Sequence, residues 1–295
     1  KKYSKNKFNP VIINVCGEWN DSENFFHQNN IEVVKFYEKN LFKFLPKNGF
    51  FKSRFSYVVI IFLSFLPLIK FLKKNKDEIL IVHLITSLPL ILKFIFNIEI
   101  KTVLRISGYP RLNILRKKFW KFVDRYLTFV TCPTIDLMNQ IKEVKLFNDN
   151  KIQFLPDAVI NIKYTNRKLK TDEKLDGSKI VLAVGRLTRQ KNFLYLLREF
   201  ENFLKIKKNY KLIILGEGEQ RDEIQSYIKK KNISDHVYLE GHVKNVFSYM
   251  KNSYVFVLPS LWEDPGFVLI EAAFSNLFII SSNCPNGPKE ILDKN

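Results

Sequence analysis

Two carboxylates flank the start of a predicted helix near the end of the chain. Glu263 lies in the loop before this helix and Glu271 lies one turn into it. The loop follows a short apolar strand, Tyr254–Leu258, and its Asp264-Pro265-Gly266 sequence is typical of a tight turn. From Phe267 onward the apolar pattern is helical. Carboxylates and the free N–H groups of a helix start can bind hydroxyl and phosphate oxygens, although acids there also complement the helix dipole without any ligand.

Two cations follow the first strand of the second half of the chain. Arg186 and Lys191 stand five residues apart after the predicted strand Ile180–Val184, where a loop leads into a helix. Such a pair is suited to a diphosphate, because Arg can hold two phosphate oxygens while Lys acts as a point charge. Cations placed in this way also stabilise the charge that develops on a leaving group. The alternative is that both side chains are ordinary solvated surface charges.

The two segments together resemble the nucleotide-sugar site of a known enzyme family. The carboxylates are spaced E-x7-E around a central Pro-Gly-Phe, and the cations lie in a G-R-L-x-x-x-K sequence. These patterns resemble the retaining glycosyltransferases of the GT-B fold, in the large bacterial glycogen-synthase-like and lipopolysaccharide group called glycosyl transferases group 1, or family 4. The match covers Ile180–Leu292, whereas the first half of the chain matches only in its pattern of elements.

The resemblance implies a role for each residue that matches a family motif. Arg186 and Lys191 would bind the sugar diphosphate, and Glu271 would bind the ribose hydroxyls. Glu263 would contact the transferred sugar, and the loop Gly241-His242-Val243 would meet the base. The implied catalytic residues are Arg186, Lys191 and Glu263. The implied donor-binding residues are Gly185, Gly216, Gly218, Gly241, His242, Val243, Pro265, Gly266, Phe267 and Glu271.

The acceptor side has two matching positions in the first half of the chain. His83 matches a histidine that family members often carry at a strand end, and Ser107 stands where many members have a histidine in the turn after the next strand. A lone histidine at a strand end is more often a structural residue than a catalyst.

The sequence holds no motif of a metal site or of another nucleotide-binding class. Its four histidines and three cysteines show no H-x-x-x-H or C-x-x-C spacing, so we expect no zinc site. Gly216-x-Gly218 lacks the third glycine of a dinucleotide fingerprint, and no G-x-x-x-x-G-K-[ST] loop occurs. We therefore expect no cofactor and no metal, since Arg186 and Lys191 can supply the cationic charge.

A formal net charge of +19 at pH 7 predicts an anionic partner. Nine bases and no acid lie between Glu38 and Asp77, and seven bases and no acid lie between Glu99 and Asp124. Both stretches are interleaved with large apolar residues, a mixture that suits an anionic membrane surface better than nucleic acid. The alternatives are a lysine-rich but merely soluble surface and a basic nucleic-acid-binding protein, for which no known motif is found.

The most apolar stretch, Phe55–Leu72, is slightly short for a membrane span and contains Pro67 and Lys70. We interpret it as a helix that is buried or rests on a membrane, with Lys73, Lys74 and Lys76 at its end. A true membrane span is the alternative.

Strands alternate with helices along the chain, which predicts an α/β protein with parallel sheets and helices on both faces. With the resemblance, this predicts a GT-B fold of two Rossmann-like, doubly wound domains that face a cleft. We expect an acceptor-side domain at residues 1–160, a polar and aperiodic linker at 161–178, and a nucleotide-sugar-binding domain at 179–295. The family's first strand and Gly-rich loop are not found before Val11, and little follows Leu292, so we expect truncation at both ends.

The sequence therefore predicts a retaining glycosyltransferase that moves a hexose or N-acetylhexosamine from a UDP-sugar to a lipid-linked, lipopolysaccharide or capsule glycan. Its partners would be the nucleotide sugar, the glycan or lipid-linked acceptor and an anionic membrane surface, and not nucleic acid. Cys16, Cys132 and Cys284 are odd in number and far apart, which is typical of reduced thiols in a cytoplasmic protein. We expect peripheral attachment to the inner face of the plasma membrane. A nucleic-acid-binding protein and a non-catalytic membrane-associated protein are the alternatives.

Overall fold

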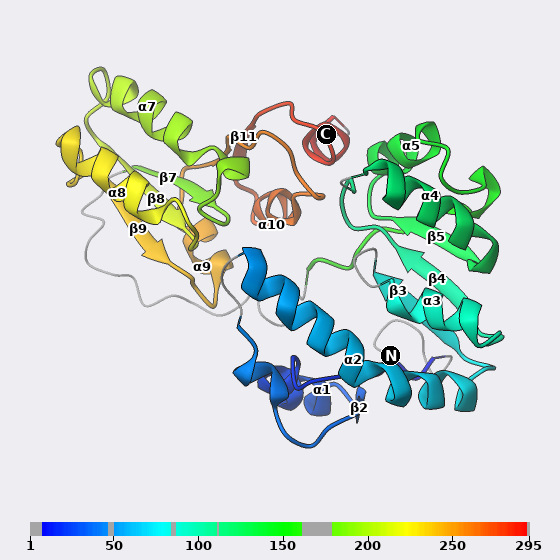
Figure 1. Cartoon of the computed structure of the whole chain (residues 1–295). Coiled ribbons are helices and arrows are strands. Elements are labelled where there is room, and N and C mark those ends of the chain that lie inside the picture. The colour runs from blue at the N-terminus through cyan, green and yellow to red at the C-terminus, as the bar shows by residue number, and fades with distance from the viewer. Residues whose placement is uncertain (1–7, 47–49, 84–86, 111, 161–178, 294–295) are drawn as a thin grey trace. The chain divides into compact units, whose positions relative to one another are not determined.

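The structure is a computed structural model that describes residues 8–46, 50–83, 87–110, 112–160 and 179–293 (Figure 1). The chain divides into two compact units, the first made of Lys1–Leu104 with Arg125–Thr128 and the second of Arg105–Asp124 with Phe129–Asn295. The predicted linker at 161–178 lies outside the described residues, so the predicted domain boundaries stay a prediction.

Strands and helices alternate in residues 8–160, as the sequence predicts, with ends that differ by a few residues. The elements are β1 (Val11–Asn14), α1 (Glu23–Gln28), β2 (Glu32–Lys35), α2 (Phe50–Lys74), β3 (Ile79–His83), α3 (Leu88–Ile95), β4 (Lys101–Arg105), α4 (Ile114–Val123), β5 (Phe129–Cys132), α5 (Ile135–Glu143) and β6 (Ile152–Phe154). Strands β1 and β2 pair in parallel, and so do β5 and β6. The order of the second sheet is β3-β4-β5-β6.

Helix α2 is longer than the predicted Phe55–Leu72 and continues through Pro67. Its C-terminal part packs Leu68, Ile69 and Leu72 against Leu88 and Leu92 of α3, in one apolar cluster of the first unit. The other face of α2 is exposed. Within the described residues, one helical segment is long and apolar enough to cross a membrane, and it is residues 54–74 with a mean hydropathy of 2.2.

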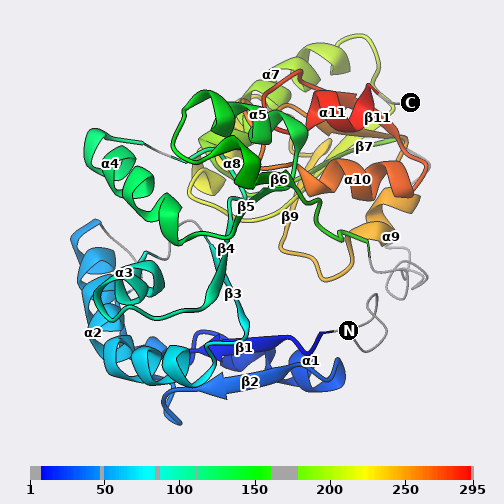
Figure 2. The ribbon, with the colours of Figure 1, turned by 90° about the vertical axis from the view of Figure 1, so that its right-hand side faces the viewer.

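The elements of residues 179–293 form a five-stranded sheet with helices on both faces (Figure 2). They are β7 (Lys179–Val184), α7 (Phe193–Leu204), β8 (Tyr210–Leu215), α8 (Arg221–Lys230), β9 (Val237–Gly241), α9 (Val246–Lys251), β10 (Val255–Leu258), α10 (Phe267–Phe274), β11 (Phe278–Ser281) and α11 (Pro288–Leu292). Their order is β11-β10-β7-β8-β9, and all four pairings are parallel. The chain therefore runs from β7 outward in one direction and then returns to lay β10 on the other side of β7. Doubly wound sheets bind ligands at this kind of switch point.

The alternation of side chains along each strand explains the two helical layers. Val181 and Ala183 of β7 face one way and pack with Leu197 of α7 and with α8. Leu182, between them, faces the other way and packs with Leu269 of α10. Strands buried on both faces are apolar, which is why β10 and the part of β7 after Lys179 are short apolar runs in the sequence.

The second unit also joins α5 to α11 and to the segment before α11. The Glu290 carboxylate accepts hydrogen bonds from the backbone N–H groups of Ile135 and Asp136, at 2.8 and 3.1 Å. In return, the Asp136 carboxylate accepts from the backbone N–H of Asn286 at 2.8 Å, and Gln140 donates to the Asn286 side chain at 2.7 Å. A carboxylate at the free N–H groups of a helix start is the stabilising arrangement. These hydrogen bonds connect residues 135–140 with residues 286–290, on opposite sides of residues 161–178.

Candidate functional site

The two loops that carry Arg186, Lys191 and Glu263 lie at the switch point of the five-stranded sheet. Strands β7 and β10 are neighbours, with Val181 opposite Val255 and Leu182 opposite Phe256. Their carboxyl ends therefore lead into the two motif loops side by side, although these loops are about 70 residues apart in the chain. The predicted placement of the loops at the carboxyl ends of strands is confirmed.

Lys191 and Glu263 form a buried ion pair between the two loops. The Lys191 ammonium lies 2.6 Å from Oε1 and 2.7 Å from Oε2 of the Glu263 carboxylate. The side chains are 12% and 3% exposed, so water screens the pair little. The buried Ser260 hydroxyl also donates to Glu263 Oε1, at 2.5 Å. The Glu263 carboxylate thus contacts Lys191 and Ser260 and is almost fully buried. Its contact with the transferred sugar stays a prediction.

Backbone hydrogen bonds hold the Glu263 loop in place. The Glu263 N–H donates to the carbonyl of Pro285 at 3.0 Å, and the Leu261 N–H donates to the carbonyl of Gln190 at 2.8 Å. The Gln190 side chain donates back to the carbonyl of Trp262 at 2.9 Å. The two motif loops are therefore held together by backbone hydrogen bonds as well as by the Lys191–Glu263 ion pair.

Two predicted glycines are required by the local backbone. Gly216 has φ 142°, and a Cβ there would overlap the carbonyl oxygen of Gly185. Gly266 has φ 80°, in the left-handed region, and precedes the first residue of α10. A side chain would be strained at either position. The other predicted glycines, Gly185, Gly218 and Gly241, lie in the loops after β7 and β8 and at the end of β9.

Arg186 and Glu271 remain available to a ligand. Arg186 is exposed, and no partner of its guanidinium is found within the part of the chain that the structure describes. Glu271 is half-buried in α10 and has no side-chain hydrogen bond or ion pair among the described residues. Burial raises the pKa of the Glu271 carboxyl above its ordinary value. A half-buried carboxyl without a partner is destabilising unless a ligand satisfies it, so Glu271 has the character of a binding group.

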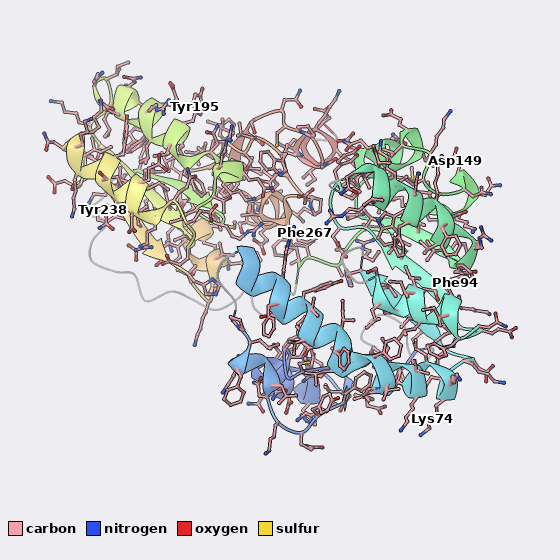
Figure 3. All side chains as sticks on the ribbon, viewed as in Figure 1. Lys74, Phe94, Asp149, Tyr195, Tyr238 and Phe267 are labelled. Atoms are coloured by element: carbon pink, nitrogen blue, oxygen red, sulfur yellow. The ribbon has the colours of Figure 1, made fainter. Side chains whose placement is uncertain are left out.

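The other predicted donor residues border the same strand ends. His242 is exposed after β9, and Val243 packs against the core on the α9 and α10 face. Pro265 is buried in the loop before α10. Phe267 begins that helix and is 37% exposed (Figure 3).

The two acceptor-side residues lie in different units. His83 is exposed at the end of β3 in the first unit. Ser107 is exposed after β4 and belongs to the second unit with the donor residues. The structure thus brings Ser107, and not His83, into the unit that carries the predicted donor site.

Two further residues join the site, although the sequence marks Asp264 only as part of a turn and Ser260 only as a strand end. Ser260 contacts Glu263, and the Asp264 carboxylate accepts a hydrogen bond from the backbone N–H of Tyr109. The string Pro-Ser-Leu-Trp-Glu-Asp is a usable signal for Ser260, which precedes Glu263 by three residues. The contact of Asp264 with Tyr109 has no sequence signal, since the two are far apart in the chain.

Among the described residues, no group of three or more His, Cys, Asp or Glu side chains is placed to hold a metal ion. Cys16, Cys132 and Cys284 are free and buried, and burial raises the pKa of the Cys132 thiol to about 11.

Comparison with known proteins shows which family and which proteins this chain is similar to. Residues 165–295 match the family described as Glycosyl transferases group 1. An uncharacterised glycosyltransferase of Methanocaldococcus jannaschii, MJ1059, is 35% identical over 193 residues, which are 62% of this chain and 46% of that protein. A Campylobacter jejuni enzyme is 28% identical over 235 residues, which are 79% of this chain and 63% of that protein. The Campylobacter enzyme is named as the α-1,4-N-acetyl-D-galactosaminyltransferase of a diNAcBac-PP-undecaprenol-linked glycan. The chain thus spans about half to two thirds of the length of these relatives.

A likeness of fold extends over nearly the whole chain. The crystal structure of Anabaena HepE in complex with UDP and glucose has a TM-score of 0.67 at 11% identity, and the match covers 94% of this chain and 81% of that one. Residues 165–295 therefore resemble the glycosyl transferases group 1 family, and the chain has the GT-B fold of glycosyltransferases.

Proposed function

We propose that this chain is the catalytic part of a retaining glycosyltransferase that uses a UDP-sugar and a lipid-linked glycan acceptor. The observation that carries the proposal is the gathering of Arg186, Lys191, Glu263 and Glu271 at the switch point of the five-stranded sheet. The Campylobacter relative is named for an undecaprenol-linked acceptor and an N-acetylhexosamine, and HepE binds UDP and glucose. These names support a hexose or N-acetylhexosamine as the transferred sugar.

The roles of the four residues follow from charge and burial. In the reaction, the bond between the sugar carbon and the diphosphate oxygen breaks, and negative charge grows on the departing diphosphate. Arg186 is free to hold this charge, and Lys191 adds a second cation from the neighbouring turn. Glu263 acts mainly on Lys191, which it orients by a two-oxygen contact. Glu271 accepts hydrogen bonds from the ribose hydroxyls, which replaces the water lost by its burial.

We expect Glu271→Gln to weaken UDP binding about 10- to 100-fold, because hydrogen bonds to a charged acceptor are worth about 1.5–3 kcal/mol. The same variant should be slightly more stable than the wild type at neutral pH. Because the pKa of Glu271 is higher in the folded chain than in the unfolded chain, ionisation of Glu271 costs the folded state more. The wild-type protein therefore has its full stability below the unfolded-state pKa of Glu271 and loses part of it as the pH rises through the folded-state pKa. Glutamine does not ionise, so the difference in melting temperature should vanish in acid. Calorimetry with UDP and melting curves across pH 4–8 measure both effects.

Glu199→Gln, an exposed carboxylate on α7, is the matched control and should change neither quantity. Unchanged UDP affinity in Glu271→Gln would contradict the assigned role. A wild-type chain that binds no nucleotide but binds DNA in a salt-dependent manner would favour the nucleic-acid alternative.

We further propose that helix α2 rests on the inner face of the plasma membrane, next to the lipid-linked acceptor. Phe55, Val58, Phe62 and Leu66 follow one stripe of the helix and are 60–85% exposed. Basic residues end the helix, including Lys73 and Lys74 (Figure 3). An apolar stripe beside cations suits the headgroup region of an anionic bilayer, where each cation contributes about 1 kcal/mol to the free energy of binding.

We expect flotation with vesicles that contain phosphatidylglycerol and no flotation with pure phosphatidylcholine. High salt should weaken the binding, because it screens surface charge. Phe62→Ser combined with Leu66→Ser should abolish it, whereas Ile206→Ser, an equally exposed apolar residue after α7, should not. Equal recovery with both kinds of vesicle would rule out an electrostatic anchor. Extraction by detergent alone would favour the membrane-spanning interpretation of α2.

A further inference from the structure

Asp264 connects the donor loop to a loop that precedes it by about 155 residues in the chain. The Asp264 carboxylate accepts a hydrogen bond from the backbone N–H of Tyr109. The same side chain lies against Gly108, where a Cβ would collide with Asp264 Oδ1 and lie 2.9 Å from Asp264 Cβ. Both partners belong to the second unit. The contact is therefore close enough that a side chain at position 108 would displace the Asp264 side chain.

The charged groups of the site surround Asp264. Partial burial raises the pKa of the Asp264 carboxyl above its ordinary value, and the neighbouring Glu263 adds to this effect. The Tyr109 N–H and the positive charges of Lys191 and Arg186 act in the opposite direction. Asp264 is thus within electrostatic reach of the three residues to which catalysis is assigned.

We propose that Asp264 is a positioning residue that fastens the Ser107–Tyr109 loop to the donor loop through the N–H of Tyr109. The loop is the one that carries Ser107, the acceptor-side residue of this unit. Its attachment to the residue after Glu263 fixes the distance between the acceptor side and the transferred sugar. The proposal deepens the proposed function and depends on it for the catalytic consequence, although the contact itself can be tested separately.

Hydrogen exchange of the Tyr109 amide tests the contact in the full chain. Asp264→Ala removes the acceptor, and Gly108→Ala displaces the Asp264 side chain, so each should speed exchange at Tyr109 roughly tenfold. The double variant should exchange no faster than either single variant, because both remove the same bond. Asp264→Asn keeps an oxygen acceptor and should exchange as the wild type does. Asp222→Ala, an exposed acid on α8, is the control.

Turnover shows whether the contact positions reacting groups. With UDP-N-acetylglucosamine and UDP-glucose as donors, Asp264→Ala and Gly108→Ala should lower the hydrolysis rate about 10- to 100-fold, because small displacements in a site carry penalties of this size. UDP affinity should stay within about threefold, since the diphosphate and ribose contacts are elsewhere, and Asp264→Asn should restore the rate.

Three results would overturn the proposal: wild-type exchange at Tyr109 in Asp264→Ala, additive effects in the double variant, or an Asp264→Asn variant as slow as Asp264→Ala. The third result would assign the effect to charge instead of the hydrogen bond. A wild type that binds no UDP but shows the expected exchange pattern would contradict the proposed function and leave the loop contact standing.

Discussion

Lys191→Ala is expected to lower the free energy of unfolding by about 3–5 kcal/mol, because it leaves the Glu263 carboxylate buried without its counter-ion. The Glu263 side chain is only 3% exposed, so water cannot replace the lost ammonium. Chemical denaturation measures the change. Lys231→Ala breaks the more exposed pair with Glu201, whose side chains are 39% and 20% exposed, and should lower stability by about 0–1 kcal/mol.

A double variant separates the structural role of this pair from its catalytic role. Lys191→Met with Glu263→Gln removes both charges and keeps an acceptor for the Ser260 hydroxyl, so most of the stability should return. Turnover should stay about 10²- to 10³-fold below the wild type, because the cation that stabilises the departing diphosphate is missing. Wild-type turnover in the double variant would show that the pair only supports the fold.

Arg186→Ala is expected to lower turnover about 10²- to 10³-fold while the protein keeps its melting temperature. The guanidinium is exposed and has no partner among the described residues, so its removal disturbs no packing. Its contribution should grow as charge develops on the diphosphate, so the loss in kcat should exceed the loss in UDP affinity. Steady-state kinetics and calorimetry with UDP give the two values.

Arg186→Lys keeps the charge but loses the two-oxygen contact, and it should recover only part of the rate. In the same assay EDTA should leave wild-type turnover unchanged, because the proposed site stabilises the diphosphate with side-chain cations. A wild-type rate in Arg186→Ala would remove this residue from the catalytic group, and loss of activity in EDTA would show that a metal ion takes part.

The sequence by itself determined the order of the elements and the contents of the two motif loops. Strands such as β7 and β10 are short apolar runs that end at Gly185 or Pro259, and both signals are local. Parallel pairing follows from the alternation of strands and helices, and parallel sheets expose their ligand loops at the carboxyl ends of strands. The charges and their place after the strands make Arg186, Lys191, Glu263 and Glu271 candidate site residues, and the family resemblance of the two loops is what favoured them over ordinary surface charges.

The sequence did not determine which of these charged side chains form ion pairs with one another. Lys191 meets Glu263, 72 residues away, because β10 returns to lie beside β7 instead of continuing outward from β9. Pairing removes Glu263 from direct contact with solvent, while Arg186 stays exposed in the same loop as Lys191. Whether a charged side chain is paired or exposed depends on its burial. Its burial depends on the order of the strands rather than on the residue type.

Contacts between segments on opposite sides of residues 161–178 were decided only by the tertiary structure. Glu290 reaches the start of α5, 155 residues earlier, and Asp264 reaches Tyr109. In the sequence these residues are an ordinary helix-start acid and an ordinary turn acid. Their partners are backbone N–H groups, which every residue except proline carries, so no pattern of side chains marks the pairing. Only the packing of the second unit determines from which backbone N–H group each carboxylate accepts a hydrogen bond.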